Sequence, residues 1–428
     1  MRILMMTNTY APHVGGVARS VSAYSQVYRE MGHDVLVVAP AFDGMEEDEA
    51  GVIRIPALQN FNGSDFSVVL SDSGLLTAAV EQFAPQIIHS HHPFLLGSTA
   101  LRLATVRSLP LVFTHHTMYE QYTHYAPGDS NLLKRFVAAL STHYANLCDQ
   151  VFAPSESIAA VLAERGVRTP IEVVPTGVRK EAYTGGDGPG FRLAMGLPKN
   201  AFIVGHVGRL ALEKNLLFLT RSVARFLQQL PQALFLVVGG GPCRKDMRAI
   251  MNEAGVGDRM VLTGVLDHPL LTSAYRAMDV FAFASKSETQ GMVLTEAMAA
   301  RVPVVALDAP GVREVVVDQR NGRLLHEESE EGMAAALGWC ATLGRTRYDR
   351  MRDEALKTAQ AYSLEKCAAR ALPIYARLHR HAVEQIAEEQ SLWDDAMRRI
   401  EAEWTVFRGI AESIGKALIS EPEPRGPT

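Results

Sequence analysis

The sequence predicts an α/β protein made of two doubly wound, Rossmann-like domains that face a cleft, followed by C-terminal helices. Two observations carry this prediction. Short apolar runs alternate with longer amphipathic segments, as is typical of parallel sheets built from β-α-β units. The alternation occurs twice, over residues 2–175 and 202–326, and the Gly-rich stretch TGGDGPG at residues 184–190 separates the two series.

The first series begins with an apolar run and a Gly15-Gly16 loop, after which an amphipathic helix is expected to reach Met31. Region 41–71 is less regular and is expected to be loop with short strands. The strands predicted for this series are residues 2–8, 34–40, 86–91, 110–116, 150–155 and 171–175.

The second series predicts strands at residues 202–208, 233–240, 259–264, 280–285, 303–307 and 322–326. From about residue 330 the pattern favours continuous helix. The polar, Pro-containing end, residues 421–428, is expected to be a disordered tail. The predicted boundaries are therefore 1–180 and 181–365 for the two domains, 366–420 for the C-terminal helices and 421–428 for the tail.

Composition excludes several classes of protein. The 428 residues carry 42 basic and 47 acidic side chains, a net charge of -5, which argues against a nucleic-acid partner. The four cysteines have no metal-ligand spacing and are expected to be buried thiols in a reducing compartment. The start, MRILMM, lacks the features of a signal peptide, and no apolar run is long enough to span a membrane. A cytoplasmic location is expected.

Two carboxylates flank a predicted helix start in SKSETQGMVLTEAMAA, residues 285–300. If the helix begins near Gly291, Glu288 lies on the preceding loop and Glu296 lies roughly 8 Å along the axis, at about 1.5 Å per residue. Unpaired N–H groups and the positive end of the helix dipole lie between them, where a diphosphate can bind. The acids could then bind a sugar and a ribose. Alternatively, Glu288 caps the helix and Glu296 is solvated.

Two cations follow the first strand of the second series, in GHVGRLALEKN at residues 205–215. At the carboxyl edge of a sheet, Arg209 and Lys214 can reach a ligand in the crevice. A diphosphate leaving group needs positive charge, which a guanidinium fork and an ammonium supply. The alternative is a surface ion pair between Arg209 and Glu213 or another acid.

Several motifs occur in order along the chain. They are Gly15-Gly16, VPTGV at 174–178, Arg-x4-Lys, GGGP at 239–242, Glu-x7-Glu and GVREVV at 311–316. Over about residues 1–380, this ordered set resembles the family 4 retaining glycosyltransferases of GT-B fold. The resemblance implies an acceptor-side N-terminal domain, a nucleotide-sugar-binding second domain, and a first C-terminal helix that crosses back to the N-terminal domain.

The resemblance also implies roles for individual residues. Glu296 would bind the ribose and Glu288 the donor sugar, while Arg209 and Lys214 would clamp the diphosphate. The backbone N–H groups near the diphosphate and sugar would belong to Gly291, Met292 and Val293. Gly15 and Gly16 would let the backbone of the first domain approach the donor, and His116, in HHT at 115–117, would line the sugar at the reaction centre.

One departure from the family pattern concerns the sugar pocket. Many members read Glu-Gly-Phe-Gly where this chain has Glu288, Thr289, Gln290 and Gly291. Because Thr289 replaces a glycine, the pocket is expected to differ in shape.

The acceptor is suggested by three segments, at residues 89–97, 113–129 and 288–291, which look like those of bacterial diacylglycerol glucosyltransferases. The resemblance implies transfer of a hexose, with glucose expected, from a UDP-sugar to a lipid at the inner face of the cytoplasmic membrane. A soluble or polysaccharide acceptor is the alternative. The candidate acceptor residues, which could equally be loop packing, are Tyr119, Tyr122 and Tyr125. The candidate basic patch, which could equally be solvated helix charge, is Arg102, Arg107, Lys134 and Arg135.

The implied mechanism is same-face displacement, in which the leaving phosphate helps to take the acceptor proton. Neither a metal nor a cofactor is required, because cationic side chains fill the metal's role. A metal site among the histidines at residues 89–92 and 115–124 is less favoured, since no nearby acid or cysteine completes a ligand set. Two other classes are weaker rivals. A dinucleotide-dependent oxidoreductase would need a GxGxxG motif, and a non-catalytic sugar-binding protein has no use for Arg209 and Lys214.

Overall fold

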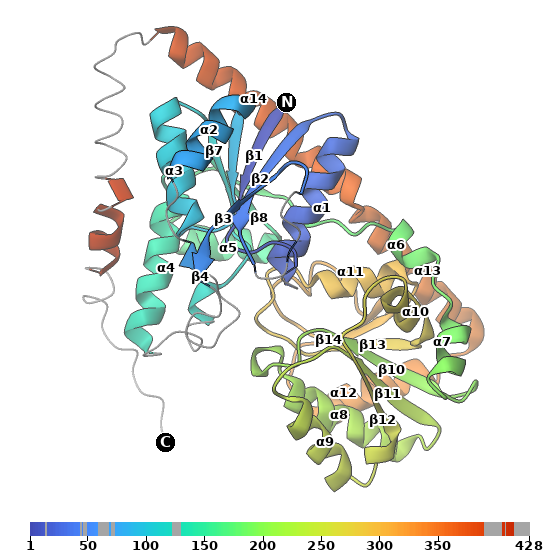
Figure 1. Cartoon of the computed structure of the whole chain (residues 1–428). Coiled ribbons are helices and arrows are strands. Elements are labelled where there is room, and N and C mark those ends of the chain that lie inside the picture. The colour runs from blue at the N-terminus through green and yellow to red at the C-terminus, as the bar shows by residue number, and fades with distance from the viewer. Residues whose placement is uncertain are drawn as a thin grey trace. The chain divides into compact units, whose positions relative to one another are not determined.

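The structure is a computed structural model that describes residues 1–12, 15–42, 45, 49–58, 68–69, 73–121, 130–388, 405–406 and 408–414. The chain forms two compact units (Figure 1). Unit 1 comprises Met1–Val174 together with Ala368–Thr428, and unit 2 comprises Pro175–Cys367. The division between them falls within the VPTGV motif, between Val174 and Pro175, and again four residues into α14 (Leu364–Glu388).

Unit 1 is built on a seven-stranded parallel sheet with the order β3-β2-β1-β6-β7-β8-β9. The strands are β1 (Arg2–Met6), β2 (Asp34–Pro40), β3 (Val52–Ile55), β6 (Ile87–Ser90), β7 (Leu111–Thr114), β8 (Gln150–Ala153) and β9 (Ile171–Val173). Two short strands, β4 (Ala57–Leu58) and β5 (Val68–Val69), pair with each other. The helices are α1 (Gly16–Glu30), α2 (Ser73–Phe83), α3 (Leu96–Arg107), α4 (Asn131–Ala145), α5 (Glu156–Glu164) and most of α14 (Leu364–Glu388), with a 3-10 turn, η2 (Tyr119–Gln121).

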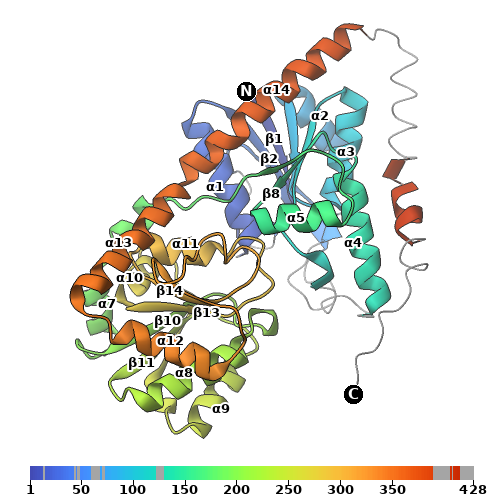
Figure 2. The ribbon, with the colours of Figure 1, turned by 180° about the vertical axis from the view of Figure 1, so that it is seen from behind.

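Helices cover both faces of this sheet. Apolar residues of β1, β6 and β7 pack with α2, α3, α4 and α5 in one hydrophobic cluster. Figure 2 shows α14 lying across the sheet. Tyr375 of α14 is fully buried there, and its ring lies 5.9 Å from those of Tyr28 in α1 and Phe152 in β8. The last long helix therefore completes the core of unit 1.

Unit 2 is built on a six-stranded parallel sheet with the order β12-β11-β10-β13-β14-β15. The strands are β10 (Phe202–Val207), β11 (Ala233–Val238), β12 (Met260–Gly264), β13 (Val280–Phe283), β14 (Val304–Leu307) and β15 (Gly322–Leu325). The helices are α6 (Glu181–Thr184), α7 (Gly188–Ala194), α8 (Leu216–Gln229), α9 (Arg244–Glu253), α10 (Leu270–Ala277), α11 (Met292–Ala299), α12 (Glu330–Ala341) and α13 (Arg345–Ala361), with 3-10 turns η4 (Leu212–Lys214) and η5 (Gly257–Arg259).

Alternate strand residues of unit 2 enter two separate hydrophobic clusters. Ile203 and Val207 pack with α10, α11 and α13, whereas Val204 between them packs with α8, α9 and α12. Each sheet also reverses its strand order once, between β1 and β6 in unit 1 and between β10 and β13 in unit 2. In doubly wound sheets, ligands bind at the carboxyl ends of the strands beside such a reversal.

The two doubly wound sheets confirm the predicted fold class, and all twelve predicted strands are present. In the irregular region 41–71, β3 joins the main sheet as its edge strand. The helix expected to be continuous from about residue 330 is instead three helices, interrupted at 342–344 and 362–363. The second interruption occurs because Ser363 pairs with Val178, so its backbone leaves the helical path. Residues 389–404 and the predicted tail lie outside the described residues.

Among the described residues, no helix combines the length and the apolarity needed to cross a membrane. All four cysteines are free and buried, as the sequence analysis predicts.

Candidate functional site

The two predicted cations lie just beyond the carboxyl end of β10. Arg209 is exposed, and the chain then passes through η4 to Lys214. The Lys214 ammonium Nζ lies 2.5 Å from Oε1 of Glu288, which follows β13. Only 20% and 18% of these two side chains are exposed. Because β10 and β13 flank the strand-order reversal, the cation loop and the acid loop meet where a doubly wound sheet binds its ligand.

Glu288 is held in its ionised form. Burial acts to raise its pKa, but the Lys214 ammonium and a hydrogen bond from Ser285 outweigh burial, so the pKa lies below its usual value. At neutral pH the site therefore holds a charged pair of zero net charge. A bound anion can attract the ammonium, and a hydroxyl can donate to the carboxylate.

The helix after this loop begins where the sequence predicts. Gly291 is the N-cap of α11 and has φ 71, a left-handed conformation that glycine adopts without strain. Met292 and Val293 form the first turn, whose N–H groups have no partner within the helix. Among the described residues no side chain caps this helix, and its N-cap is Gly291, so the alternative interpretation of Glu288 as a cap is wrong.

Glu296 is also not the solvated helix residue of the alternative interpretation. It is only 4% exposed, and its Oε2 accepts a hydrogen bond of 2.7 Å from the hydroxyl of Tyr275 in α10. The carboxylate is thus positioned by a neighbouring helix, a contact that the Glu-x7-Glu spacing does not predict.

Three of the sequence motifs meet beside Glu288. The side-chain amide of Gln290 bonds both backbone groups of Thr176, accepting from its N–H at 2.5 Å and donating to its carbonyl. Gly311, the first residue of GVREVV, has φ 77, and a Cβ there would lie 2.6 Å from the Gln290 backbone. Gln290 thus fastens the 285–291 loop to the VPTGV segment. All three motifs are visible in the sequence, but their contact is not.

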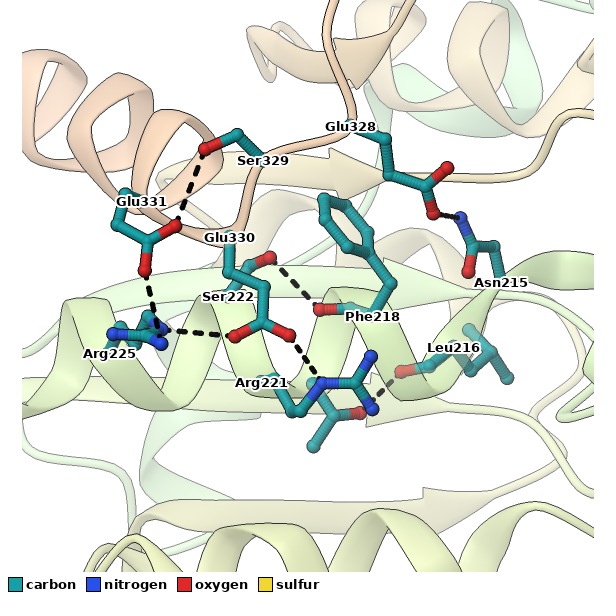
Figure 3. A network of polar contacts seen from close by, with 11 residues as sticks. Asn215, Leu216, Phe218, Arg221, Ser222, Arg225, Glu328, Ser329, Glu330 and Glu331 are labelled. Atoms are coloured by element: carbon teal, nitrogen blue, oxygen red, sulfur yellow. Dashed lines mark hydrogen bonds and ion pairs between the residues drawn. The ribbon is translucent and has the colours of Figure 1, made fainter. Parts of the chain in front are cut away.

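A second contact ties both loops to the start of α12. The carboxylate of Glu328 accepts from Asn215 Nδ2 at 2.7 Å and also pairs with Lys286. Figure 3 shows the Asn215 contact together with the neighbouring pairs between α8 and α12, in which Arg221 and Arg225 meet Glu330. The Asn215 hydrogen bond and the Lys286 ion pair thus join the 209–215 and 285–291 loops through Glu328.

Unit 1 places the other predicted residues at the carboxyl edge of its own sheet. Gly15 has an extended backbone and caps α1, and a Cβ added to Gly16 would meet nothing within 4 Å. The chain's own packing therefore does not require Gly16 to be glycine.

His116 follows β7, and its Nε2 lies 2.9 Å from Nδ1 of His91, which follows β6. Burial lowers the pKa of His116 to about 3, so its imidazole is neutral at physiological pH.

Of the candidate acceptor residues, the structure describes only Tyr119, which is buried. The ring of Tyr119 packs against Phe94 and His115, at 4.9 and 5.7 Å between centroids, and only 9% of the residue is exposed. Tyr122 and Tyr125 lie outside the described residues. In the candidate basic patch, Arg107 pairs with Glu81 at 3.2 Å. The other three residues of the patch, Arg102, Lys134 and Arg135, are half-buried on α3 and α4.

The histidines do not assemble a metal site in the described part of the chain, where no group of three or more His, Cys, Asp or Glu side chains could hold a metal ion.

Comparison with known proteins defines the family. Residues 14–182 match the model of Glycosyltransferase Family 4, and residues 191–358 match the model of Glycosyl transferases group 1. The D-inositol 3-phosphate glycosyltransferase of Kribbella flavida is 30% identical over 315 residues, which cover 71% of this chain and 73% of that protein. The chain belongs to glycosyltransferase family 4. It is therefore an enzyme, as its motifs predict.

Two further similarities extend over most of this glycosyltransferase. The alpha-monoglucosyldiacylglycerol synthase of Streptococcus pneumoniae is 26% identical over 339 residues, 77% of this chain and 76% of that protein. The crystal structure of Anabaena Alr3699/HepE in complex with UDP-glucose covers 91% of this chain and 100% of its own, with a TM-score of 0.67 and 21% identity. The structural similarity confirms the GT-B fold.

Proposed function

We propose that this glycosyltransferase transfers glucose from UDP-glucose to a hydroxyl of diacylglycerol, with retention of the anomeric configuration. The observation that carries the donor half of the proposal is the charged pair of Lys214 and Glu288 beside the first turn of α11. A cation, an acid and helix N–H groups, gathered at the strand-order reversal, suit a negatively charged sugar nucleotide.

Each candidate site residue of unit 2 has a proposed role in binding the donor. Glu296, positioned by Tyr275, accepts hydrogen bonds from the ribose hydroxyls, and Glu288 accepts them from the sugar. Arg209, Lys214 and the amides of Gly291, Met292 and Val293 stabilise the diphosphate as it departs, when its negative charge is greatest. The Lys214 ammonium keeps the Glu288 carboxylate ionised until the donor arrives.

His116 and the Gly15–Gly16 loop are proposed to act on the donor sugar. A neutral imidazole can donate one hydrogen bond to a sugar oxygen without adding charge at the developing cationic centre. The departing phosphate then takes the acceptor proton on the face that it leaves.

The choice of UDP and glucose is supported by similar proteins. Relatives from Streptococcus pneumoniae and Acholeplasma laidlawii are alpha-monoglucosyldiacylglycerol synthases, and a structure of the same fold holds UDP-glucose. GDP-mannose-dependent alpha-mannosyltransferases are 27–29% identical, which makes GDP-mannose the competing donor to test.

The lipid acceptor is supported by those two synthases and by α4. This helix carries half-buried Lys134 and Arg135 next to exposed Leu132, a combination that suits an anionic membrane surface at the cytoplasmic leaflet. We propose that the enzyme binds there peripherally to reach diacylglycerol.

The decisive experiment incubates the purified chain with UDP-glucose, UDP-galactose or GDP-mannose, each with diacylglycerol in mixed micelles or with soluble sugars. Nucleotide release and an α-linked glucolipid are expected only with UDP-glucose and diacylglycerol. Nucleotide release with GDP-mannose and not with UDP-glucose would overturn the assignment of UDP-glucose as the donor. Release only with soluble or polysaccharide acceptors would overturn the lipid acceptor while leaving the transferase intact.

A further inference from the structure

A pair of imidazoles lies at the carboxyl edge of unit 1, one from each of two neighbouring strands. His91 follows β6 and is 1% exposed, and its Nδ1 lies 2.9 Å from Nε2 of His116. The two rings stack with centroids 5.2 Å apart. Burial holds the pKa of His91 well below its usual value and that of His116 at about 3, so both rings are neutral. A neutral pair shares one hydrogen: one ring donates and the other accepts.

The surroundings of His91 decide which ring donates. Its other nitrogen, Nε2, is buried and has no hydrogen-bond partner among the described residues. If His91 accepted at Nδ1, its proton would sit on Nε2 as a buried N–H without an acceptor, which is rare in proteins. If His91 donates from Nδ1, Nε2 carries only a lone pair, the less costly group to leave unsatisfied.

We propose that His91 is a positioning residue that donates from Nδ1 to His116 Nε2 and thereby fixes the proton of His116 on Nδ1. His116 is then a hydrogen-bond donor at Nδ1. The opposite tautomer would present a lone pair there, which would repel a sugar oxygen that has no proton to give. The proposal deepens the proposed function and rests on the assignment of His116 to the donor sugar.

A second histidine packs against the His91 ring. The centroid of the His89 ring lies 4.1 Å from that of His91, closer than the 5.2 Å between the His91 and His116 rings. Both nitrogens of His89 are bonded at 2.7 Å, Nε2 to the hydroxyl of Thr114 and Nδ1 to the hydroxyl of Tyr375. Because β7 and α14 each contribute a partner, His89 is fixed in place and supports the His91 ring.

Two substitutions at position 91 separate the hydrogen bond from packing. His91→Asn places an amide nitrogen where Nδ1 was and keeps a donor to His116, whereas His91→Leu fills similar space without a donor. For UDP-glucose, we expect the leucine variant to lose about tenfold or more in kcat, the effect of one hydrogen bond. The asparagine variant should stay within about threefold of the wild type. UDP affinity, which does not involve the sugar, should be the same in all three.

The tautomer itself is read by nitrogen NMR of the full chain labelled at its histidines, with His116→Gln to assign the signal. The wild type and His91→Asn should show the proton of His116 on Nδ1, and His91→Leu a mixture or the other tautomer. A proton on Nε2 in the wild type would overturn the proposal, as would wild-type turnover in His91→Leu when His116→Gln is impaired. If His116→Gln itself turns over normally, the role of His116 in the proposed function fails, while the NMR spectrum still decides whether His91 fixes its tautomer.

Discussion

The hydroxyl of Tyr275 and the carboxylate of Glu296 form a buried hydrogen bond of 2.7 Å between α10 and α11. The bond restricts the side chain of Glu296 to one orientation. A carboxylate positioned in advance loses less conformational freedom when it binds a ribose. The bond therefore links a tyrosine that touches no ligand in our proposal to the affinity for the nucleotide.

Replacing Tyr275 by phenylalanine should weaken UDP binding by about fivefold, because one hydrogen bond is worth about 1 kcal/mol and its loss frees the carboxylate. Calorimetric titration with UDP measures the change. Tyr348→Phe is the matched control, since that hydroxyl also donates within unit 2, to the carbonyl of Asp279 at 2.6 Å. Equal affinity in the Tyr275 and Tyr348 variants would contradict the positioning of Glu296.

Arg209 should contribute to turnover and little to folding, because it is exposed. Arg209→Ala should lower kcat by about a hundredfold, the effect of removing one group that stabilises developing negative charge. Arg209→Lys should recover only part of the rate, since an ammonium lacks the guanidinium fork. Arg345→Ala, at a side chain that is 96% exposed, is the control. We expect every variant to unfold at a thermal midpoint near that of the wild type. If Arg209→Ala then turns over at the wild-type rate, Arg209 does not stabilise the diphosphate.

Replacing Gly16 by alanine should change the kinetics of the enzyme without lowering its stability. A Cβ at this position meets nothing within 4 Å, and alanine favours a helix over glycine by up to about 1 kcal/mol, so Gly16→Ala should be as stable as the wild type or slightly more so. If the donor approaches this backbone, the methyl group should raise KM for UDP-glucose by about tenfold. Gly338→Ala in α12 also meets open space and should leave KM unchanged. Wild-type kinetics in Gly16→Ala would show that the donor does not come close to α1.

Gln290 should stabilise unit 2 through both of its bonds to Thr176. Gln290→Glu keeps the shape but sets a carboxylate oxygen against the Thr176 carbonyl, with an expected loss of about 1–3 kcal/mol in the free energy of unfolding. Urea unfolding measures it. In the control, Gln228→Glu, the amide donates to the Ala254 carbonyl at an exposed position, and the loss should be well below 1 kcal/mol. Similar losses in the two variants would mean that the buried contact with Thr176 is of little consequence.

Lowering the pH should destabilise the protein at pH values well above those at which its carboxylates protonate. Burial is the main cause that lowers the pKa of His89, His115 and His116 to about 3 and that of His206 to about 4. In the unfolded chain these groups titrate near about 6.5, so between those values the unfolded state binds more protons. Above about pH 6.5 these histidines do not destabilise the protein. As the pH drops below that value, the free energy of unfolding falls by up to about 1.4 kcal/mol per pH unit for each histidine.

Thermal midpoints measured from pH 7.5 to pH 5 test this dependence. His206→Phe keeps an aromatic ring beside Phe281 and Phe283 and removes one titrating group, so its midpoint should fall less steeply than that of the wild type. Parallel curves for the two proteins would show that His206 is not kept neutral by the fold.

The sequence contains the signals for the fold and for much of the unit 2 site. Apolar strands and the turn glycines are local features, so all twelve predicted strands and the helix start at Gly291 could be read from them. The sequence also places Lys214 and Glu288 on loops after strands, but it does not predict their pairing, because the pairing requires that β10 and β13 be neighbours in the sheet.

The contacts that position the site could not be predicted in the same way. Gln290 and Thr176 are 114 residues apart, and nothing in either motif shows that an amide should bond a backbone there. His91 and His116 belong to visible histidine runs, but their contact requires that β6 and β7 be neighbours. Tyr275 is one apolar residue among many on α10, and only the packing of α10 on α11 shows that its hydroxyl meets Glu296.

The course of α14 has a consequence for how the chain matures during synthesis. Tyr375 supplies a partner for His89, yet it follows the whole of unit 2 in the sequence, 286 residues later. A ribosome therefore delivers every residue of unit 2 before the last core residue of unit 1 emerges. Unit 2 can therefore complete its core before unit 1, whose sheet stays uncovered on one face until α14 is synthesised. A chain truncated near residue 365 would contain a folded unit 2 and a unit 1 that lacks part of its core.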